Sequence, residues 1–243
     1  MLLAIDVGNT RIKCAVFKED TLLELYITNE NSFRNNIEKI LSDYPKISVF
    51  MVASVGKLSK NDFLWVKKSI KIYFVTHSAD FPFSNTYKTP ETLGIDRMIL
   101  ASGASLKYPN HNKLIIDAGT AITYDFVDKN NCYFGGAISA GINLRYKALN
   151  TYTVKLPLLE KSEEEIFIGK NTAESIHSGV INGVLFEIEG FIKELKSQYD
   201  NFIIILTGGD TDFLAKRLKS TIFANQNFLL ESLNDLYQYQ KRK

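Results

Sequence analysis

The sequence predicts a duplicated α/β protein, and three observations support this prediction. An apolar, strand-like run ends at Asp6-Val7-Gly8, and a second one ends at Asp117-Ala118-Gly119. Both are followed by further strand-like segments and then by helices that alternate with strands. The two aspartates are 117 − 6 = 111 residues apart, close to half of the 243-residue chain. Two such turns, each beginning the same order of elements, indicate an internal repeat. We therefore expect two α/β lobes, residues 1–109 and 110–243, with a cleft between them.

In the first half, apolar periodicity and turn residues separate strands from helices. The segment that opens the chain reads as three strands joined by short polar turns, and alternating helices and strands follow. We expect strands at 2–6, 12–17, 22–27, 48–55 and 71–76, helices at 33–44, 60–70 and 95–106, and a loop rich in Ser, Thr and Pro at 77–92.

The second half repeats this order, and no low-complexity linker separates it from the first. Its longest helical stretch places apolar residues close to one face, as expected for a helix that covers a sheet. We expect strands at 113–117, 122–127, 132–138, 202–206 and 222–230, and helices at 143–152, 173–198, 212–218 and 231–240.

The composition excludes several classes of function. A net charge of +2 gives no bulk field for binding nucleic acid or an anionic membrane. The longest tight apolar run, 202–206, is far shorter than the roughly 18 residues of a membrane helix. The first residues lack the basic region of a signal peptide. With only Cys14 and Cys132, two reduced buried cysteines are expected, and a disulfide or metal pair is the alternative. We expect a cytoplasmic protein without membrane or nucleic-acid partners.

The turn that follows the first strand has the residues of a phosphate site. Gly8 lets the backbone approach an anion closely, Asn9 and Thr10 add donors, and Lys13 adds positive charge. Asp6 is a candidate for holding Mg²⁺ through water, because magnesium keeps much of its hydration. Taken alone, the segment reads equally as a plain hairpin turn.

The second turn strengthens this interpretation. Asp117 offers a carboxylate to a cation, and Thr120 offers a hydroxyl to a phosphate. Neither the Walker sequence nor Gly-x-Gly-x-x-Gly is present, so P-loop and dinucleotide folds are disfavoured. Two glycine turns at equivalent places in a duplicated fold point to a nucleotide whose phosphates and metal are held between them.

Two further segments are candidates for chemistry. Gly94-Ile95-Asp96-Arg97 opens a helix, where the carboxylate can accept a proton from a hydroxyl and the guanidinium can hold a carboxylate. The alternative is an ordinary helix start with Asp96 near the positive end of the dipole. The turn at 207–210 suits backbone contact with a nucleotide, although a simple connecting loop is an equal interpretation.

Taken in order, these elements resemble the type III pantothenate kinases, a family of the acetate kinase, sugar kinase, Hsp70 and actin superfamily. The resemblance implies a duplicated ribonuclease H-like (actin-like ATPase) fold, with a mixed five-stranded sheet in each lobe and a nucleotide cleft between them. It rests on the segments Asp6-Val7-Gly8-Asn9-Thr10, Gly94-Ile95-Asp96-Arg97, Asp117-Ala118-Gly119-Thr120-Ala121, Gly135-Gly136, Leu156-Pro157, Gly169-Lys170-Asn171-Thr172 and Thr207-Gly208-Gly209.

The resemblance also implies a function and its residues. The family phosphorylates pantothenate with ATP to give 4′-phosphopantothenate, the first step of coenzyme A biosynthesis. Asp96 would accept the hydroxyl proton, and Asp117 would bind a monovalent cation, K⁺ or NH₄⁺, which the family needs besides Mg²⁺. ATP would be held by Asp6, Val7, Gly8, Asn9, Thr10, Arg11, Ile12, Lys13 and Thr120, and pantothenate by Tyr87, Gly94, Ile95, Asp96, Arg97 and Thr172. Members of the family are homodimers with the substrate site near the subunit interface.

The chain departs from the family pattern at one place and leaves two other functions open. It reads Ser139-Ala140-Gly141 where the family usually has Pro-Gly after the preceding Gly-Gly-x-Ile element. A transcriptional regulator of the Bvg accessory factor type shares the fold, and another kinase of the superfamily would act on a different small substrate. An enzyme is favoured by the intact residues Asp6, Asp96, Arg97 and Asp117, and the segment 94–97 favours pantothenate.

Overall fold

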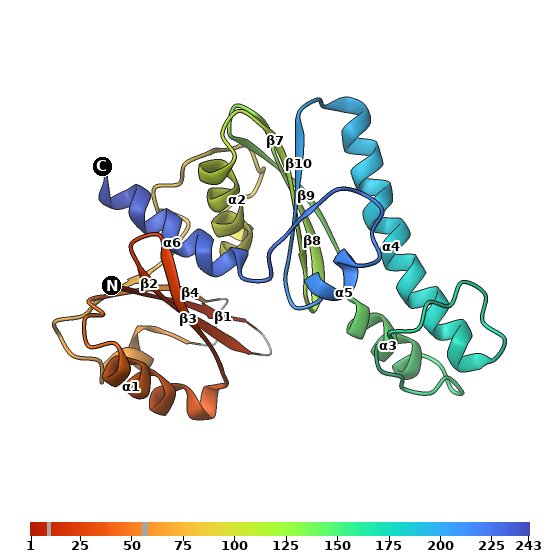
Figure 1. The fold of residues 1–243 in the computed structure, drawn as a ribbon, viewed down its shortest axis with the longest axis horizontal. Coiled ribbons are helices and arrows are strands. Elements are labelled where there is room, and N and C mark those ends of the chain that lie inside the picture. Colours follow the sequence, from red (N-terminus) through yellow and green to blue (C-terminus); the bar gives the residue numbers. More distant parts are fainter. Residues whose placement is uncertain (9–10, 55–57) are drawn as a thin grey trace. The chain divides into compact units, whose positions relative to one another are not determined.

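The computed structural model describes residues 1–8, 11–54 and 58–243, which form two compact units (Figure 1). Unit 1 contains Met1–Pro109, Asn131–Tyr133 and Asn227–Lys243. Unit 2 contains Asn110–Asn130 and Phe134–Gln226. The predicted ATP-binding residues Asn9 and Thr10 lie outside the described ranges.

Unit 1 is built on a five-stranded sheet in the order β3-β2-β1-β4-β5. Strand β1 is antiparallel to β2 and parallel to β4, and β4 is parallel to β5. The strands are β1 (Leu2–Val7), β2 (Ile12–Lys18), β3 (Thr21–Thr28), β4 (Val49–Ser54) and β5 (Lys71–Phe74). The helices are η1 (Glu30–Ser32), α1 (Phe33–Asp43), η2 (Lys60–Phe63), η3 (Pro90–Thr92), α2 (Ile95–Lys107) and α6 (Phe228–Lys241).

Alternation along the strands supplies apolar side chains to both faces of this sheet. Leu3 and Ile5 pack with Ile37 and Ile40 of α1 in one core cluster. Leu2 and Ala4 belong to a different cluster, which includes Ile99 of α2 and buried leucines of α6. Helix α1 and helix α6 therefore cover opposite faces of the sheet, as Figure 1 shows.

Unit 2 contains most of a second sheet, in the order β11-β10-β7-β8-β9-β6. Strand β7 is antiparallel to β8 and parallel to β10, and β10 is parallel to β11. One core cluster joins these strands to α3, α4 and α5. The elements are β6 (Ser84–Asn85), β7 (Asn112–Ala118), β8 (Ala121–Val127), β9 (Cys132–Ala140), α3 (Ile142–Thr151), α4 (Thr172–Gln198), β10 (Phe202–Thr207), α5 (Thr211–Ala215) and β11 (Phe223–Ala224).

The two sheets repeat the same strand order, which confirms the predicted duplicated α/β fold. With β7 as the counterpart of β1, each sheet runs third, second, first, fourth, fifth strand. In both, the first strand is antiparallel to the second and parallel to the fourth. The second sheet has six strands rather than the predicted five, because the short β6 adds to β9 through two residue pairs.

Two predicted elements are wrong. The expected helix at 60–70 is only the 3₁₀ turn η2. The ring of Phe63 packs edge-on against Phe33 and Phe74, and the chain leaves the helical conformation after it. The expected strand at 222–230 is only Phe223–Ala224, because α6 begins at Phe228 and its leucines are buried at helical spacing.

Within the ranges that the structure describes, no helix is both long enough and apolar enough to cross a membrane.

Candidate active site

Asp6 lies at the end of β1, where the hairpin with β2 sets its surroundings. Its register partner is Lys13, and the N–H of Gly8 donates to the carbonyl of Arg11 at 3.2 Å, closing the turn. Burial raises the pKa of Asp6 to about 6. Lys13 opposes this rise in the pKa and the negative charge of Asp96 adds to it. The predicted ATP-binding aspartate and the predicted catalytic aspartate are therefore close enough to interact.

Asp96 is held at the first turn of α2. Its Oδ1 accepts a hydrogen bond from the N–H of Arg97 at 2.9 Å. A Cβ placed on Gly94, the residue that caps the helix, would lie 2.4 Å from that oxygen. A side chain at position 94 would therefore displace the Asp96 carboxylate. The family resemblance implies only that Gly94 lines the pantothenate site, and the structure adds this packing reason for a glycine.

Arg97 and Tyr87 lie together beside Asp96. Arg97 is only 5% exposed, and its Cζ lies 5.9 Å from the centroid of the Tyr87 ring. The Tyr87 ring in turn lies 6.3 Å from the ring of Tyr133, and its N–H donates to Oδ1 of Asn85 at 2.9 Å. Five of the six predicted pantothenate residues, 87 and 94–97, thus belong to unit 1 together with Asp6.

In unit 2, the turn after β7 packs against the turn after β10. Gly208 has φ +97°, a backbone conformation that favours glycine. A Cβ at this position would lie 2.4 Å from Oδ1 of Asp117 and 2.4 Å from the carbonyl oxygen of Ala118. The N–H of Asp210 donates to the same carbonyl at 3.0 Å. Asp117 and the 207–210 turn, both singled out from the sequence, therefore form one structure.

Gly141 fixes the other side of the Asp117 turn. Its N–H donates to the carbonyl of Thr120 at 3.0 Å, and a Cβ there would lie 2.1 Å from the carbonyl oxygen of Gly119. Where the family pattern has proline, the loop is held by Arg145. Its Nε donates to the carbonyl of Ala140 at 2.8 Å, and its Nη2 donates to Oγ of Ser139 at 3.0 Å. These side-chain contacts hold the loop without the proline.

Thr172 is the one predicted pantothenate residue that does not belong to unit 1. It is the first residue of α4 and belongs to unit 2. It lines a cavity of about 740 Å³ whose other walls come from α3 and α4 and from Leu156. The walls include Arg145 and Ser175 but are otherwise mostly apolar.

The structure adds side-by-side contacts that the sequence does not predict, because the N–H groups of Asp210 and Gly141 both donate to carbonyls of the Asp117 turn. The Gly-Gly-Asp sequence after a buried strand was the only signal for Asp210, and nothing local connected Gly141 with Gly119.

The donors in both units fit hard cations. Among the described residues, no group of three or more His, Cys, Asp or Glu is placed to hold a metal. In phosphoryl-transfer sites, however, Mg²⁺ uses one or two carboxylates together with substrate phosphates and water. Asp6 beside Asp96, and Asp117 beside a glycine turn, offer oxygen ligands of that kind.

Comparisons with known proteins agree with this fold and place the chain in a family. Residues 2–194 match the family model described as type III pantothenate kinase. The type III pantothenate kinase of Flavobacterium johnsoniae is 57% identical over 240 residues, 99% of this chain and 98% of its own length.

Solved structures support the fold alone, since their identities to this chain are low. A structure described as a Baf family transcriptional activator from Campylobacter jejuni has a TM-score of 0.62 at 21% identity, covering 99% of this chain and 100% of that one. A glucokinase from an Antarctic psychrotroph has a TM-score of 0.53 at 13% identity, covering 98% of each chain.

The fold is that of the actin-like ATPases and sugar kinases, and the family matches make the chain a kinase. Within this class, the chain belongs to the type III pantothenate kinase family, as the family model over residues 2–194 and the 57% identity to a relative along nearly the whole chain show.

Proposed function

We propose that this chain transfers the γ-phosphoryl group of ATP to the hydroxyl of pantothenate, giving 4′-phosphopantothenate in the first step of coenzyme A biosynthesis. Family membership supports the reaction. The observation that carries the residue assignment is the Asp96 carboxylate, fixed at the start of α2 and interacting with Asp6.

Asp96 acts as the proton acceptor. Phosphoryl transfer depends mainly on alignment and on neutralising charge, so the acceptor needs only to orient the hydroxyl and take its proton late. Arg97, buried beside Tyr87, pairs with the pantothenate carboxylate. The proposal assigns residues 94–97, Tyr87 and Thr172 to pantothenate binding.

ATP is held by the segment from Asp6 to Lys13 and by Thr120, through backbone N–H groups, hydroxyls and the Lys13 ammonium. Asp6 would hold Mg²⁺, and Asp117 would hold a K⁺ or NH₄⁺ ion. These cations supply neutralisation of phosphate charge. Oxygen donors beside glycine turns support both assignments.

We further propose that residues 1–109 and 110–243 are the two duplicated lobes, and that the protein is a cytoplasmic homodimer. Self-association is supported by apolar side chains exposed on unit 2, where the rings of Phe167 and Phe186 lie 6.5 Å apart. Their exposed fractions are 71% and 61%, which is high for aromatic residues.

A coupled assay of ADP release tests the reaction. With ATP and Mg²⁺ present, release should require pantothenate and should rise several-fold when K⁺ replaces Na⁺. ATP consumption with a sugar but not with pantothenate would indicate another kinase of the superfamily. Absence of ADP release with any acceptor would favour a regulator.

A further inference from the structure

The chain between α3 and α4 has no helix or strand from residue 152 to residue 171. Irregular segments of this length are uncommon inside a domain, and they usually serve a function. Leu156 and Leu159 of this segment pack against the core of unit 2, whereas Leu158 and Phe167 are exposed. It is also attached to Asp210 and Arg217, which flank α5, by charged side chains at two points, Lys161 and Glu163.

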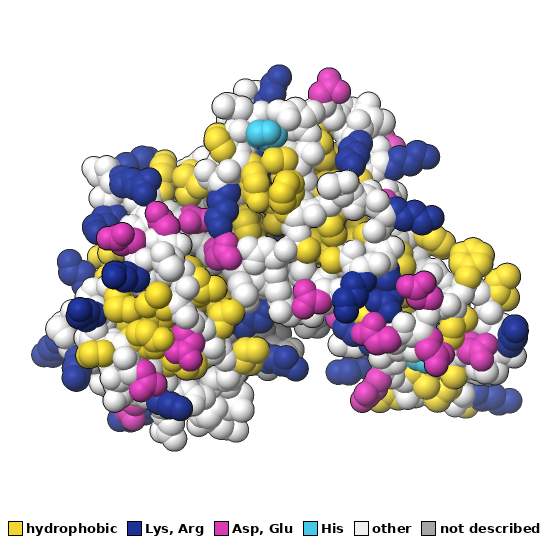
Figure 2. Space-filling view, in the orientation of Figure 1, with side chains coloured by type: hydrophobic (Ala, Val, Ile, Leu, Met, Phe, Trp, Pro, Cys, Tyr) yellow, Lys and Arg dark blue, Asp and Glu magenta, His cyan; other side chains and the backbone are white. Residues whose placement is uncertain are grey.

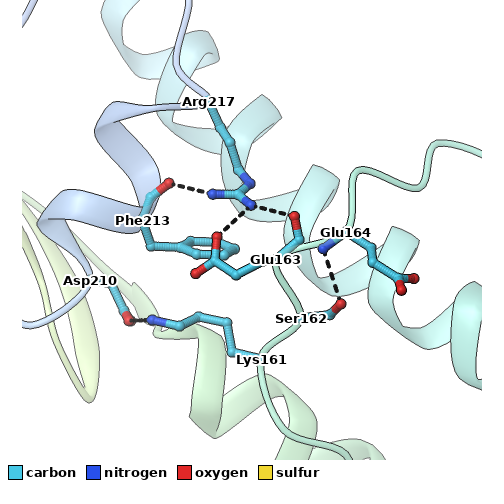
Figure 3. Close-up of polar contacts among 7 residues, drawn as sticks. All are labelled: Lys161, Ser162, Glu163, Glu164, Asp210, Phe213 and Arg217. Carbon is cyan, nitrogen blue, oxygen red and sulfur yellow. Dashed lines mark hydrogen bonds and ion pairs between the residues drawn. The ribbon is translucent and has the colours of Figure 1, made fainter.

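The first attachment is the ion pair between Lys161 and Asp210. Nζ of Lys161 donates to Oδ1 of Asp210 at 2.6 Å, and the exposed side-chain fractions are 27% and 11% (Figure 3). Because the pair is largely removed from water, loss of the lysine would leave a poorly solvated carboxylate.

The second attachment is made by Arg217. Its Nη2 donates to the carbonyl of Glu163 at 2.8 Å and to Oε2 of Glu163 at 2.9 Å, and its Nη1 donates to the carbonyl of Phe213 at 3.0 Å. The Arg217 side chain is only 7% exposed. In Figure 2, lysine and arginine side chains gather over α5 with acidic side chains around them.

Phe213 joins the two attachments. Cζ of Arg217 lies 3.8 Å from the centroid of its ring, and Nζ of Lys161 lies 4.7 Å from it. Figure 3 shows the ring between the two cations. A cation over an aromatic ring is stabilised by the ring quadrupole, so both cations have a fixed position. Segment 161–163 is therefore held against α5 by these ion pairs and cation–π contacts.

Asp210 connects the contacts between segment 161–163 and α5 to the glycine turns of unit 2. Its N–H donates to the carbonyl of Ala118, and the hydroxyl of Thr211 donates to the carbonyl of Gly208 at 2.7 Å. The Asp210 carboxylate thus lies next to the turns that would meet the nucleotide. An unpaired negative charge there would repel phosphates, and Lys161 neutralises it.

We propose that Lys161 is a positioning residue for nucleotide binding, acting through Asp210 to hold and neutralise the turn at 207–210. This inference rests on the proposed use of that turn by ATP. Lys161 itself touches no reacting atom, so its loss should act on ATP affinity and leave pantothenate affinity unchanged.

The test measures the Kd of a non-hydrolysable ATP analogue by calorimetry, together with both KM values. Lys161→Gln should raise the Kd and the KM for ATP by at least about tenfold, with the KM for pantothenate within about twofold. Lys161→Arg should restore most of the affinity. Lys155→Gln, which removes one charge from an exposed position of the same segment, is the matched control and should change nothing.

A double-mutant cycle separates neutralisation from simple loss of packing. Lys161→Gln combined with Asp210→Asn has no uncompensated carboxylate, so its Kd should return to within about threefold of the wild-type value. An unchanged Kd in Lys161→Gln, or a double variant as weak as the single one, would overturn the proposal. If the wild type binds the analogue but does not phosphorylate pantothenate, only the proposed function fails. If it binds no analogue, both fail.

Discussion

The N–H of Asp210 donates to the carbonyl of Ala118 at 3.0 Å, and this bond joins the two glycine turns of unit 2. The turns come from strands β7 and β10, which are parallel neighbours with Asp117 opposite Thr207. Because the carboxyl ends of adjacent parallel strands meet at one edge of a sheet, residues far apart in the sequence form a single rigid surface. The first prediction follows from how closely that surface is packed.

Gly208→Ala should disrupt this surface. The new Cβ would meet Asp117 and Ala118, and the φ of +97° is unfavourable for alanine. We expect the free energy of unfolding to fall by about 1–3 kcal/mol and ATP affinity to fall at least about tenfold. Chemical denaturation and calorimetry measure the two effects.

Gly190→Ala is the control for this variant. Gly190 is exposed inside α4, and a Cβ there meets nothing within 4 Å. Alanine should therefore stabilise the helix by about 0.5–1 kcal/mol without changing activity. If Gly208→Ala behaved like Gly190→Ala, the packing account of the turn would be wrong.

Gly94→Ala should impair the chemical step without unfolding the protein. Its Cβ would lie 2.4 Å from Oδ1 of Asp96, so the carboxylate must rotate away from the N–H of Arg97. A displaced acceptor costs about 100-fold in kcat, whereas the Kd for ATP should stay unchanged. Steady-state kinetics with a thermal melt would reveal this, and a normal kcat would count against the assigned geometry.

Arg97→Lys should weaken pantothenate binding selectively. Lysine keeps the charge but loses the planar fork that pairs with a carboxylate and lies over the Tyr87 ring. We expect the KM for pantothenate to rise at least about tenfold and the KM for ATP to change less than about twofold. Equal changes in both KM values would instead indicate general damage to the site.

Asp235→Asn should change the pH dependence of stability. Burial raises the pKa of Asp235 from 3.8 to about 6, Lys107 opposes this rise, and Glu231 and Asp20 add to it. Between these pH values the folded protein binds a proton that the unfolded chain does not, so stability falls as the pH rises from about 4 to 6.

The asparagine variant lacks this titration. At pH 7 it should be more stable than the wild type by roughly 1–2 kcal/mol, and the difference should shrink towards pH 4. Urea denaturation at a series of pH values is the measurement, with activity as the control for an intact site. If the stability of both proteins changed by the same amount between pH 4 and 6, the prediction would be wrong.

Most of the sheet framework was predictable from sequence, because buried strands carry strong local patterns. The runs ending at Asp6 and Asp117 are examples, and the two Asp-x-Gly turns gave the duplication. The failures occurred where packing overrides local preference. The segment after Phe63 has helical composition but leaves the helix once that ring is buried, and α6 begins earlier than expected because Leu230 packs in the core of unit 1.

The candidate site residues that stand in sequence motifs were predictable, whereas the contacts between distant segments were not. Asp6, Asp96 and Arg97 stand in recognisable motifs, and the structure brings them into one unit. The contact between Lys161 and Asp210 joins residues 49 apart through an irregular segment. No periodicity or motif connects them, so only the folded chain reveals this contact.

The central claim is that Asp96 serves the transfer of phosphate to pantothenate, and mass spectrometry of the product tests it most directly. Wild-type protein with ATP, Mg²⁺, K⁺ and pantothenate should form 4′-phosphopantothenate. Asp96→Asn should form it at least about 100-fold more slowly, while its Kd for the ATP analogue stays within about twofold of wild type. No phosphorylated pantothenate from the wild type, or turnover by Asp96→Asn within about tenfold of it, would contradict the account.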